Sequence, residues 1–544
     1  MATDIITAQG KPALNTVALA CKRVLYMVCL LPSVAVVAAE IKFVPQITVS
    51  GYGYQLKEEP ATDWDEGLAA SVAPAVSWIA NGNNLKSSLF WQTESIWYDD
   101  AQREHDTFDE YRFNNVVSGF NKRLHWGLNA SSNYRVRNSQ QGVFADRITG
   151  AQHLGRIRSH GSFLNWNTLP ISRINGAVNL NYRKNKSEEP QEQDGFSNFE
   201  NETYNAALQL ASKDRAAGFF WQLGGNYTKT TRETADDFVS KHGNFLVGVP
   251  LYHRLSLIGR GSYESNDSSE FYNNEFRSYG AGLEFKFGRV SRVNVSVNRA
   301  KTENQFGEEE ETYLAGDFYL APSRRSSLSG YWDRRYFGRT AAVSGQYNLR
   351  FLTMRLSVND TVRSMSALDF EFEDLGVFVC PDGYIGMSDC FRPPSAGYQP
   401  GAGETFQRFF DINQDIREDI VLRRSGALSI GYNKNRLALN LGLSVSEDEF
   451  VELGSVNRSN TASLNVVWKL SEHLRWVSNI RFYELNYVTE QREDNNLSAS
   501  TGLEKTLSAH SDISFNVRRT SRNSNVVARD ISENRVWFSY RYKF

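Results

Sequence analysis

Long apolar runs are missing from most of this 544-residue chain. After Ala39, no segment approaches the roughly 18 to 20 continuous apolar residues that a membrane-spanning helix needs, so helical spans are excluded. An excess of one charge is missing too: the formal net charge is -2, which gives no electrostatic reason to expect nucleic acid as a partner. Aromatic residues, in contrast, make up 13% of the chain, which argues against disorder.

The one substantial apolar stretch, Val24–Val37, lies near the N-terminus. Basic residues precede it, and Ala38 and Ala39 followed by the charged Glu40 form a signal-peptidase pattern. We therefore predict that residues 1–39 are a secretory signal peptide. A retained single-span anchor is the alternative, and it is disfavoured because the apolar stretch is shorter than the ~20 residues of a span.

Cysteine is scarce. Two of the four cysteines, Cys21 and Cys29, fall in the predicted signal peptide, which leaves Cys380 and Cys390 as the only pair in the mature chain. In an oxidising envelope compartment such a pair is most simply a disulfide. The chain has no CxxC or CxxCH motif and no glycine-rich phosphate loop, so we expect no cofactor.

Catalytic motifs are also missing. None of the eight histidines has a metal-ligand spacing or lies beside a recognisable nucleophile motif. The carboxylate run Glu308–Glu311 is more simply a solvated loop tip than an acid/base pair. We therefore predict that the protein is not an enzyme and has no catalytic, cofactor-binding or metal-binding residues.

What the chain does have throughout is alternation with a period of two. In Val536–Phe544, apolar or aromatic residues occupy every even position, and polar residues occupy every odd position except Trp537. Successive side chains of a strand point to opposite faces, so such a segment suits a strand between lipid and a polar lumen. The same period returns in segments such as Leu124–Val136 and Tyr279–Phe287. The C-terminal Phe544 also resembles the signal by which barrels are handed to their assembly machinery.

Counting such segments from Ile41 to Phe544 gives about 24 strands, with a range of roughly 20 to 26. We therefore predict an all-β protein: residues 40–544 form one transmembrane, antiparallel, up-and-down β-barrel with both ends in the periplasm and without a plug domain. A large soluble β-protein such as a propeller is the alternative. It should repeat a blade motif every ~40 to 50 residues, and we find no such repeat.

The connections between predicted strands are alternately short and long, as periplasmic turns and surface loops would be. The longest connection, from about Ser364 to Asp415, contains the mature cysteines, and we expect it to lie outside the cell and to cap the mouth or fold into it. The other long connections, most of them acidic, are Lys57–Glu66, Asp99–Glu110, Lys184–Glu202, Glu303–Glu311, Glu447–Asn457 and Thr489–Asn496.

Aromatic residues near the ends of predicted strands suit the interfacial girdles of a membrane barrel. They are Trp97, Tyr98, Tyr134, Tyr182, Tyr227, Tyr263, Tyr432 and Tyr487.

The polar face of the predicted strands is rich in arginine and asparagine. The arginines expected to line the lumen are Arg135, Arg137, Arg173, Arg183, Arg260, Arg292, Arg355, Arg475, Arg481, Arg518, Arg535 and Arg541. Asparagines interleave with them at Asn129, Asn175, Asn179, Asn181, Asn226, Asn294, Asn298, Asn359, Asn440, Asn479 and Asn516. These side chains either offer donors to hydroxyl and carboxylate groups of a solute or pair with acidic neighbours such as Glu264 and Glu284. In both cases the interior suits polar or anionic solutes.

One segment carries a family resemblance. Asp333–Thr340, of sequence DRRYFGRT, and the predicted strand Met354–Thr361 resemble the most recognisable stretch of the PEP-CTERM-system-associated outer-membrane proteins. That family accompanies exopolysaccharide gene clusters. The resemblance implies a plugless barrel in the Gram-negative outer membrane that serves as the exit for a secreted polysaccharide.

Two functions remain open: a polysaccharide export channel, and a general or sugar-selective uptake porin. Porins have roughly 16 to 18 strands, whereas a barrel of about 24 strands would be wider and could pass a polymer. The expected partners are outer-membrane lipids, the barrel assembly machinery, periplasmic polysaccharide export proteins and a polysaccharide in the lumen. A surface adhesin is a third alternative.

Overall fold

The computed structural model describes residues 40–100, 105–136, 147–151, 154–168, 173–188, 200–212, 218–233, 236–269, 272–288, 290–304, 307–366, 373–381, 404–411, 418–451, 454–527 and 529–544. All the regular elements in these ranges are β-strands. No helix in the described ranges is long and apolar enough to cross a membrane.

The strands, in chain order, are β1 (Glu40–Glu58), β2 (Asp65–Asn81), β3 (Leu85–Tyr98), β4 (Asp106–Gly119), β5 (Leu124–Val136), β6 (Leu154–Asn167), β7 (Ile174–Glu188), β8 (Glu200–Ser212), β9 (Phe220–Arg232), β10 (Phe238–Tyr252), β11 (Leu255–Ser269), β12 (Tyr272–Phe287), β13 (Ser291–Asn304), β14 (Gly307–Ser323), β15 (Ser326–Arg335), β16 (Gly338–Asn348), β17 (Leu352–Ser366), β18 (Glu373–Pro381), β19 (Glu404–Asp411), β20 (Glu418–Lys434), β21 (Leu437–Phe450), β22 (Ser455–Lys469), β23 (Leu474–Tyr487), β24 (Arg492–Ser508), β25 (Ser511–Ser524) and β26 (Ile531–Lys543).

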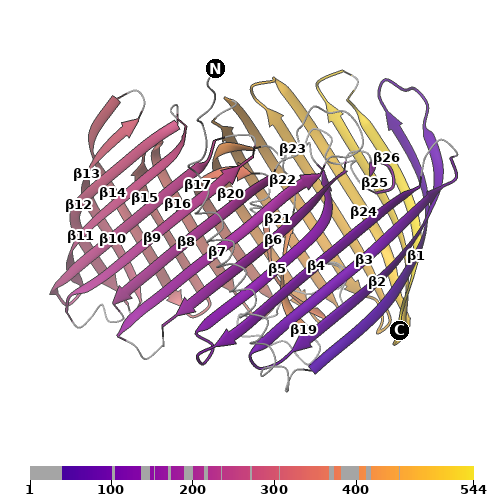
Figure 1. The fold of residues 1–544 in the computed structure, drawn as a ribbon, viewed down its shortest axis with the longest axis horizontal. Helices are drawn as coiled ribbons and strands as arrows, with labels where there is room; N and C mark the ends of the chain where they lie inside the picture. Colours follow the sequence, from indigo (N-terminus) through magenta and orange to yellow (C-terminus); the bar gives the residue numbers. More distant parts are fainter. Residues whose placement is uncertain are drawn as a thin grey trace, which may run out of the picture.

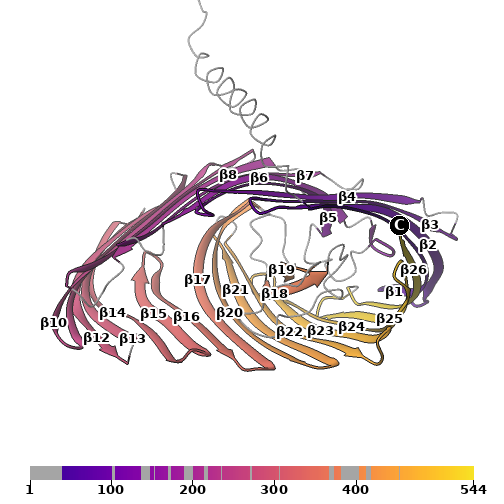
Figure 2. The same cartoon turned by 90° about the horizontal axis from the view of Figure 1, so that it is seen from below.

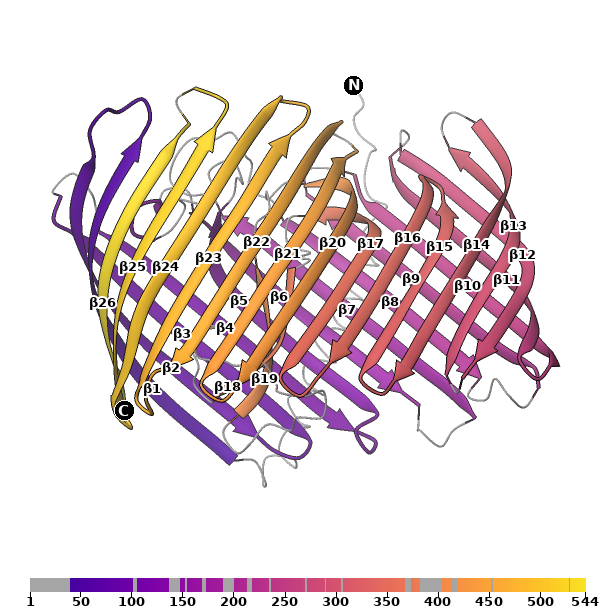
Figure 3. The same cartoon turned by 180° about the vertical axis from the view of Figure 1, so that it is seen from behind.

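Twenty-four of these strands form one closed antiparallel ring (Figures 1 and 3). Each strand of the ring pairs with the ring strands before and after it in the sequence, and β26 pairs with β1 from Gln46 opposite Lys543 to Glu58 opposite Ile531. Closure removes the unpaired edges that an open sheet would expose. The predicted all-β fold and the predicted number of strands are confirmed.

The ring keeps its up-and-down order across the longest predicted connection. β17 pairs directly with β20, and the hairpin of β18 and β19 forms a separate two-stranded sheet between them in the sequence. This hairpin falls in the connection from about Ser364 to Asp415 that we expected to cap the mouth or fold into it. The absence of a plug domain stays a prediction.

The two faces of the ring carry different side chains. Arg260 in β11 pairs with Asp333 in β15 across three intervening strands, and such a contact can form only on the concave side. Apolar residues alternate with these two and therefore lie on the outer face, where Val536 and Phe538 are 41% and 49% exposed. Phe544 is 69% exposed, and its N–H donates to the Pro45 carbonyl, so the start of β1 and the end of β26 lie at the same end of the ring.

Several acidic segments that we predicted to be loops are strand ends, and those predictions are wrong. The run Glu308–Glu311 belongs to β14 and pairs with β13, where Lys301 lies 2.9 Å from Glu308 and Arg299 binds Glu310. Likewise β21 extends to Phe450, β22 begins at Ser455 and β24 begins at Arg492. Cross-strand ion pairs let these ladders continue beyond the roughly 9 to 11 residues that cross a bilayer.

The ring is flattened. Figure 2 shows one long wall that contains β4–β8 facing a second that contains β20–β24, with β10–β14 closing one narrow end and β1–β3 at the other. The β18–β19 hairpin lies inside the outline of the ring in this view. Cα atoms of β17 and β9 come within 8 Å of each other, although the two strands belong to opposite walls (Figure 3).

Candidate functional site

The inner face of the ring is the candidate site, and strand register decides which predicted arginines lie on it. Arg173 lies just before β7, and the Arg135 side chain and Arg137 are outside the described residues. For all twelve predicted arginines, a role in transport stays a prediction. The predicted arginines that the register places on the inner face are Arg183, Arg260, Arg292, Arg355, Arg475, Arg481, Arg518, Arg535 and Arg541.

Most of these inner arginines pair with carboxylates of the same face. The pairs are Arg260 with Asp333, Arg292 with Glu284 at 3.9 Å, Arg475 with Glu504, Arg518 with Glu533 at 3.0 Å, Arg535 with Glu533, and Arg541 with Asp512 at 3.8 Å. The sequence left open whether the inner arginines face a solute or pair with acidic neighbours. For these six arginines, the structure shows pairing with acidic neighbours. The inner charges compensate one another instead of forming an unbroken cationic track.

One narrow end of the ring is joined by a network of such contacts. Arg335 in β15 donates to Glu264 in β11 at 2.8 Å, and the Glu264 side chain is only 3% exposed. Asp333 accepts from Tyr313 at 2.9 Å and binds Arg260. Asp333 and Arg335 belong to the segment that carries the family resemblance, and here they link strands that are not neighbours in the ring.

A short segment, residues 147–151, folds into the ring on the other side. Arg147 binds the carboxylates of Glu94 at 2.7 Å and Glu110, which are inner-face residues of β3 and β4. Burial by itself would lower the pKa of Arg147, but the two carboxylates outweigh it and raise the pKa above its ordinary value. Arg147 therefore stays charged, and the segment stays tied to this wall.

Apolar packing and further hydrogen bonds hold the same segment. Tyr98 donates to the Arg147 carbonyl at 3.0 Å, and Arg535 donates to Thr149 at 2.8 Å. Ile148 belongs to a buried cluster with Tyr54, Ala69, Ile96, Phe108 and Leu154. The sequence did not predict this segment, because its only signal was an apolar residue beside a charged one within a long polar connection.

The paired ends of β17 and β20 form a second inward feature. Ile420, Val421 and Leu422 are consecutive residues near the start of β20, and all three are buried, whereas a wall strand leaves its lipid-facing positions exposed. Both faces of this end are therefore covered. Together with the approach of β17 to β9, this burial indicates that the end of the pair leaves the wall and crosses the interior.

The predicted aromatic girdle is wrong at some positions. Tyr98 and Tyr134 pack on the buried cluster that holds residues 147–151, and Tyr487 is 3% exposed with the Arg492 guanidinium 4.9 Å from its ring centre. Trp537, which breaks the C-terminal alternation, lies on the inner face opposite Tyr52. A tyrosine hydroxyl can form a hydrogen bond inside the ring as readily as at the membrane–water interface.

The predicted disulfide lies largely outside the described residues. Cys380 is a residue of β18, where it stands opposite Thr405 of β19, but Cys390 and the intervening segment are not described. The disulfide stays a prediction, as does the signal peptide of residues 1–39.

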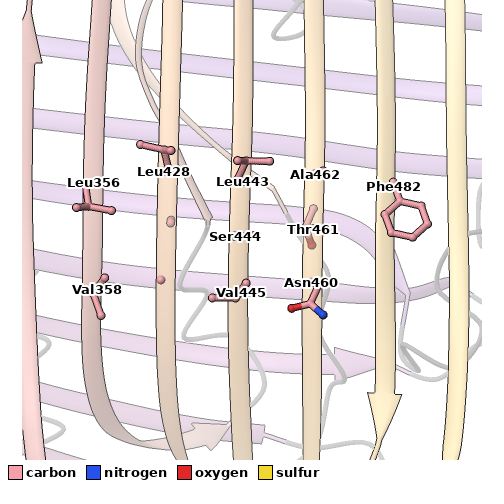
Figure 4. Close-up of a pocket in the computed structure, with 12 residues that line it drawn as sticks. Leu356, Val358, Leu428, Leu443, Ser444, Val445, Asn460, Thr461, Ala462 and Phe482 are labelled. Atoms are coloured by element: carbon pink, nitrogen blue, oxygen red, sulfur yellow. The ribbon is translucent and has the colours of Figure 1, made fainter.

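An apolar depression of about 490 Å³ lies on the outer face over β17 and β20–β23 (Figure 4). Large side chains such as Leu356, Val445 and Phe482 surround it, while Gly426 and Ala462 leave room at its floor. Because its large side chains are those of the lipid-facing set, the depression is part of the apolar wall and not of the polar interior. In the described ranges, no group of three or more His, Cys, Asp or Glu side chains could hold a metal ion.

Residues 433–544 match the model of the family described as "Putative beta-barrel porin 2". These residues comprise β21–β26 and the end of β20. The match supports an outer-membrane β-barrel and an outer-membrane channel. No curated protein sequence matches the chain.

Solved structures give only a distant likeness. The siderophore receptor PirA from Acinetobacter baumannii is 9% identical, with 93% of this chain and 81% of that chain covered and a TM-score of 0.42. The FrpB iron transporter from Neisseria meningitidis is 11% identical, with 92% and 81% covered and a TM-score of 0.38. OccAB3 from Acinetobacter baumannii is 8% identical, with 92% and 100% covered and a TM-score of 0.29. Likeness at this level carries no argument about what the chain binds.

Proposed function

We propose that the protein is an outer-membrane channel that exports a hydrophilic polysaccharide from the periplasm to the cell surface. The observation that carries this proposal is a closed ring of 24 strands with a charge-compensated polar inner face. Barrel diameter grows with strand number, and porins of roughly 16 to 18 strands already enclose an aqueous channel. A wider ring therefore has room for a hydrated polymer.

The inner face suits the passage of a polymer better than its tight retention. Paired charges give a weak net field, so a polymer would meet mainly hydroxyl and amide groups, which exchange hydrogen bonds with water and with sugars at little net cost. The family match supports a role without chemistry, which is our prediction for this chain.

The inward features would restrict leakage while no polymer is present. Residues 147–151 and the crossing end of β17 and β20 lie at the end of the ring opposite Phe544. Our placement puts that end at the cell surface. Periplasmic export proteins would dock at the opposite end, where Phe544 would also be presented to the assembly machinery. Outer-membrane lipids would cover the apolar outer face.

Deletion of the gene tests the proposal. The expected result is less secreted polysaccharide, with polymer held in the periplasm or its synthesis shut down, and restoration by a plasmid copy. Measurement of cell-surface and periplasmic carbohydrate distinguishes these cases from a general loss of envelope integrity.

An uptake porin is the second candidate, and the description of the matched family favours it. A deletion strain that secretes normal amounts of polysaccharide but grows poorly on one sugar or solute would establish uptake and overturn export.

A further inference from the structure

Inner positions on five consecutive strands, β6–β10, carry no carboxylate. The only acidic residues of these strands, Glu188, Glu200 and Glu202, alternate with the inner positions. They pair on the outer face, Glu188 with Arg158 at 2.8 Å and Glu202 with Lys184 at 3.1 Å. These strands belong to the longest run in the ring whose inner positions lack a carboxylate, whereas β11, β15, β24 and β26 carry inner carboxylates that pair with arginines.

Amide side chains take the place of charges on this wall. We define the amide wall by its members on β6–β10, which are Asn165, Asn167, Asn175, Asn179, Asn181, Asn185, Asn201, Asn205, Gln209, Gln222, Asn226 and Asn244. The register places Asn165 opposite Asn179 and Asn181 opposite Asn205, so the amides form rows across neighbouring strands.

Some amides of the wall orient each other, and others remain exposed. Asn205 donates to Asn226 at 2.9 Å and to Thr228 at 2.8 Å. Gln209, Gln222 and Asn244 are exposed on the inner side of the ring. An amide presents two N–H donors and a carbonyl acceptor, which matches a hydroxyl group that both donates and accepts.

An aromatic ring lies beside the amide wall. Phe163 is opposite Gly127 on one side and Asn181 on the other. A Cβ at Gly127 would come 2.2 Å from the Phe163 ring, so the ring lies over the glycine, flat against the inner wall. A half-buried ring in this position offers an apolar surface next to amides, which is the combination that suits the C–H face and the hydroxyls of a sugar ring.

We infer that the amide wall and Phe163 form a binding track for a glycan without net charge. This inference deepens the proposed export function and rests on it. Two cations occupy inner positions of these strands, Arg183 and Arg232, and Arg232 donates to the Asp236 carbonyl at 2.6 Å and to Ser268 at 2.9 Å. An acidic polymer would require a wall in which such cations predominate, whereas amides predominate here.

Binding to the purified, folded full chain in detergent tests the track. Calorimetric titration would compare maltodextrin oligomers, which are neutral, with oligogalacturonate of similar length, which is acidic. The test variant combines Asn165→Ala with Asn179→Ala, and the matched control combines Asn465→Ala with Asn479→Ala, an asparagine pair in the same opposed arrangement on β22 and β23.

We expect maltodextrin to bind more tightly than oligogalacturonate. The test variant should weaken maltodextrin binding about tenfold, as the loss of two hydrogen bonds predicts, and the control should change it less than about twofold. If the test variant does not fold, Gln209→Ala with Asn244→Ala replaces it, because these exposed side chains contribute less to packing.

Tighter binding of the acidic oligomer, or equal weakening by both pairs of substitutions, would overturn the inference. A protein that conducts ions in planar bilayers but binds no neutral glycan would overturn the binding track and would be consistent with the proposed channel. Wall-dependent glycan binding in a protein whose deletion leaves secretion normal would support the track and overturn the proposed export function.

Discussion

The Arg335 guanidinium links β15 to β11, although three strands, β12–β14, lie between them in the ring. Its partner Glu264 is buried, so Arg335→Ala would leave a buried carboxylate without its cation. Changes of this kind typically cost about 3 to 5 kcal/mol. We expect a clear fall in the temperature at which the folded, heat-modifiable gel band is lost.

Arg299→Ala is the matched control for that prediction. Arg299 binds Glu310 on the same half of the ring, but both side chains are more than half exposed, and exposed pairs contribute little. Equal loss of stability in the two variants would contradict a structural role for the network around Glu264.

Phe544 provides a second test at the residue scale. It extends the apolar outer face and lies 5.0 Å from the Tyr542 ring, in the position that we expect the assembly machinery to recognise. Deletion of Phe544 should lower the amount of protein in the outer membrane, measured by membrane fractionation. Lys543→Ala, which changes an inner-face residue at the same end, should assemble normally, and a fully assembled truncation would refute the signal.

Among the elements, residues 147–151 are an inward segment that ion pairs hold to the wall. Arg147→Ala removes the contacts with Glu94 and Glu110. Two charge-assisted bonds of about 1.5 kcal/mol or more each correspond to roughly a hundredfold change in the docking equilibrium. We expect larger single-channel conductance in planar bilayers and greater sensitivity of cells to bulky antibiotics.

Arg424→Ala is the control for that element, because Arg424 binds Glu447 at 2.9 Å on the outer face. Unchanged conductance in both variants would show that residues 147–151 do not limit the opening.

At the scale of the whole molecule, the polar interior depends on closure of the ring by the pairing of β1 with β26. Ser50 in β1 and Ser539 in β26 are register partners with their hydroxyl oxygens 2.8 Å apart. In a background with Cys380→Ser and Cys390→Ser, the combination of Ser50→Cys with Ser539→Cys should form a disulfide after oxidation. The product would be a covalent ring with altered mobility after boiling.

The control for closure combines Ser50→Cys with Ser429→Cys. Ser429 is a residue of β20 on the inner face, and strands β21–β26 separate it from β1 in the ring. A cross-link in this control, or none between β1 and β26, would contradict the closed ring.

The strands and their two faces could be predicted because alternation is a local property of an extended backbone. The segment Leu124–Val136 was predicted from its alternation alone, and β5 has the same bounds. The C-terminal pattern similarly anticipated β26. The strand number followed because each alternating segment forms one strand.

What only the tertiary structure decided depends on curvature and on contacts between distant segments. Arg260 and Asp333 are 73 residues apart in the sequence, and nothing local indicates that they meet. Acidic segments such as Glu308–Glu311 resemble loops because their polarity is visible in the sequence, while the cations that let them continue as strands belong to the neighbouring strand. The inward course of residues 147–151 depends on a wall made by β1, β3, β4 and β26, which exists only once the ring has closed.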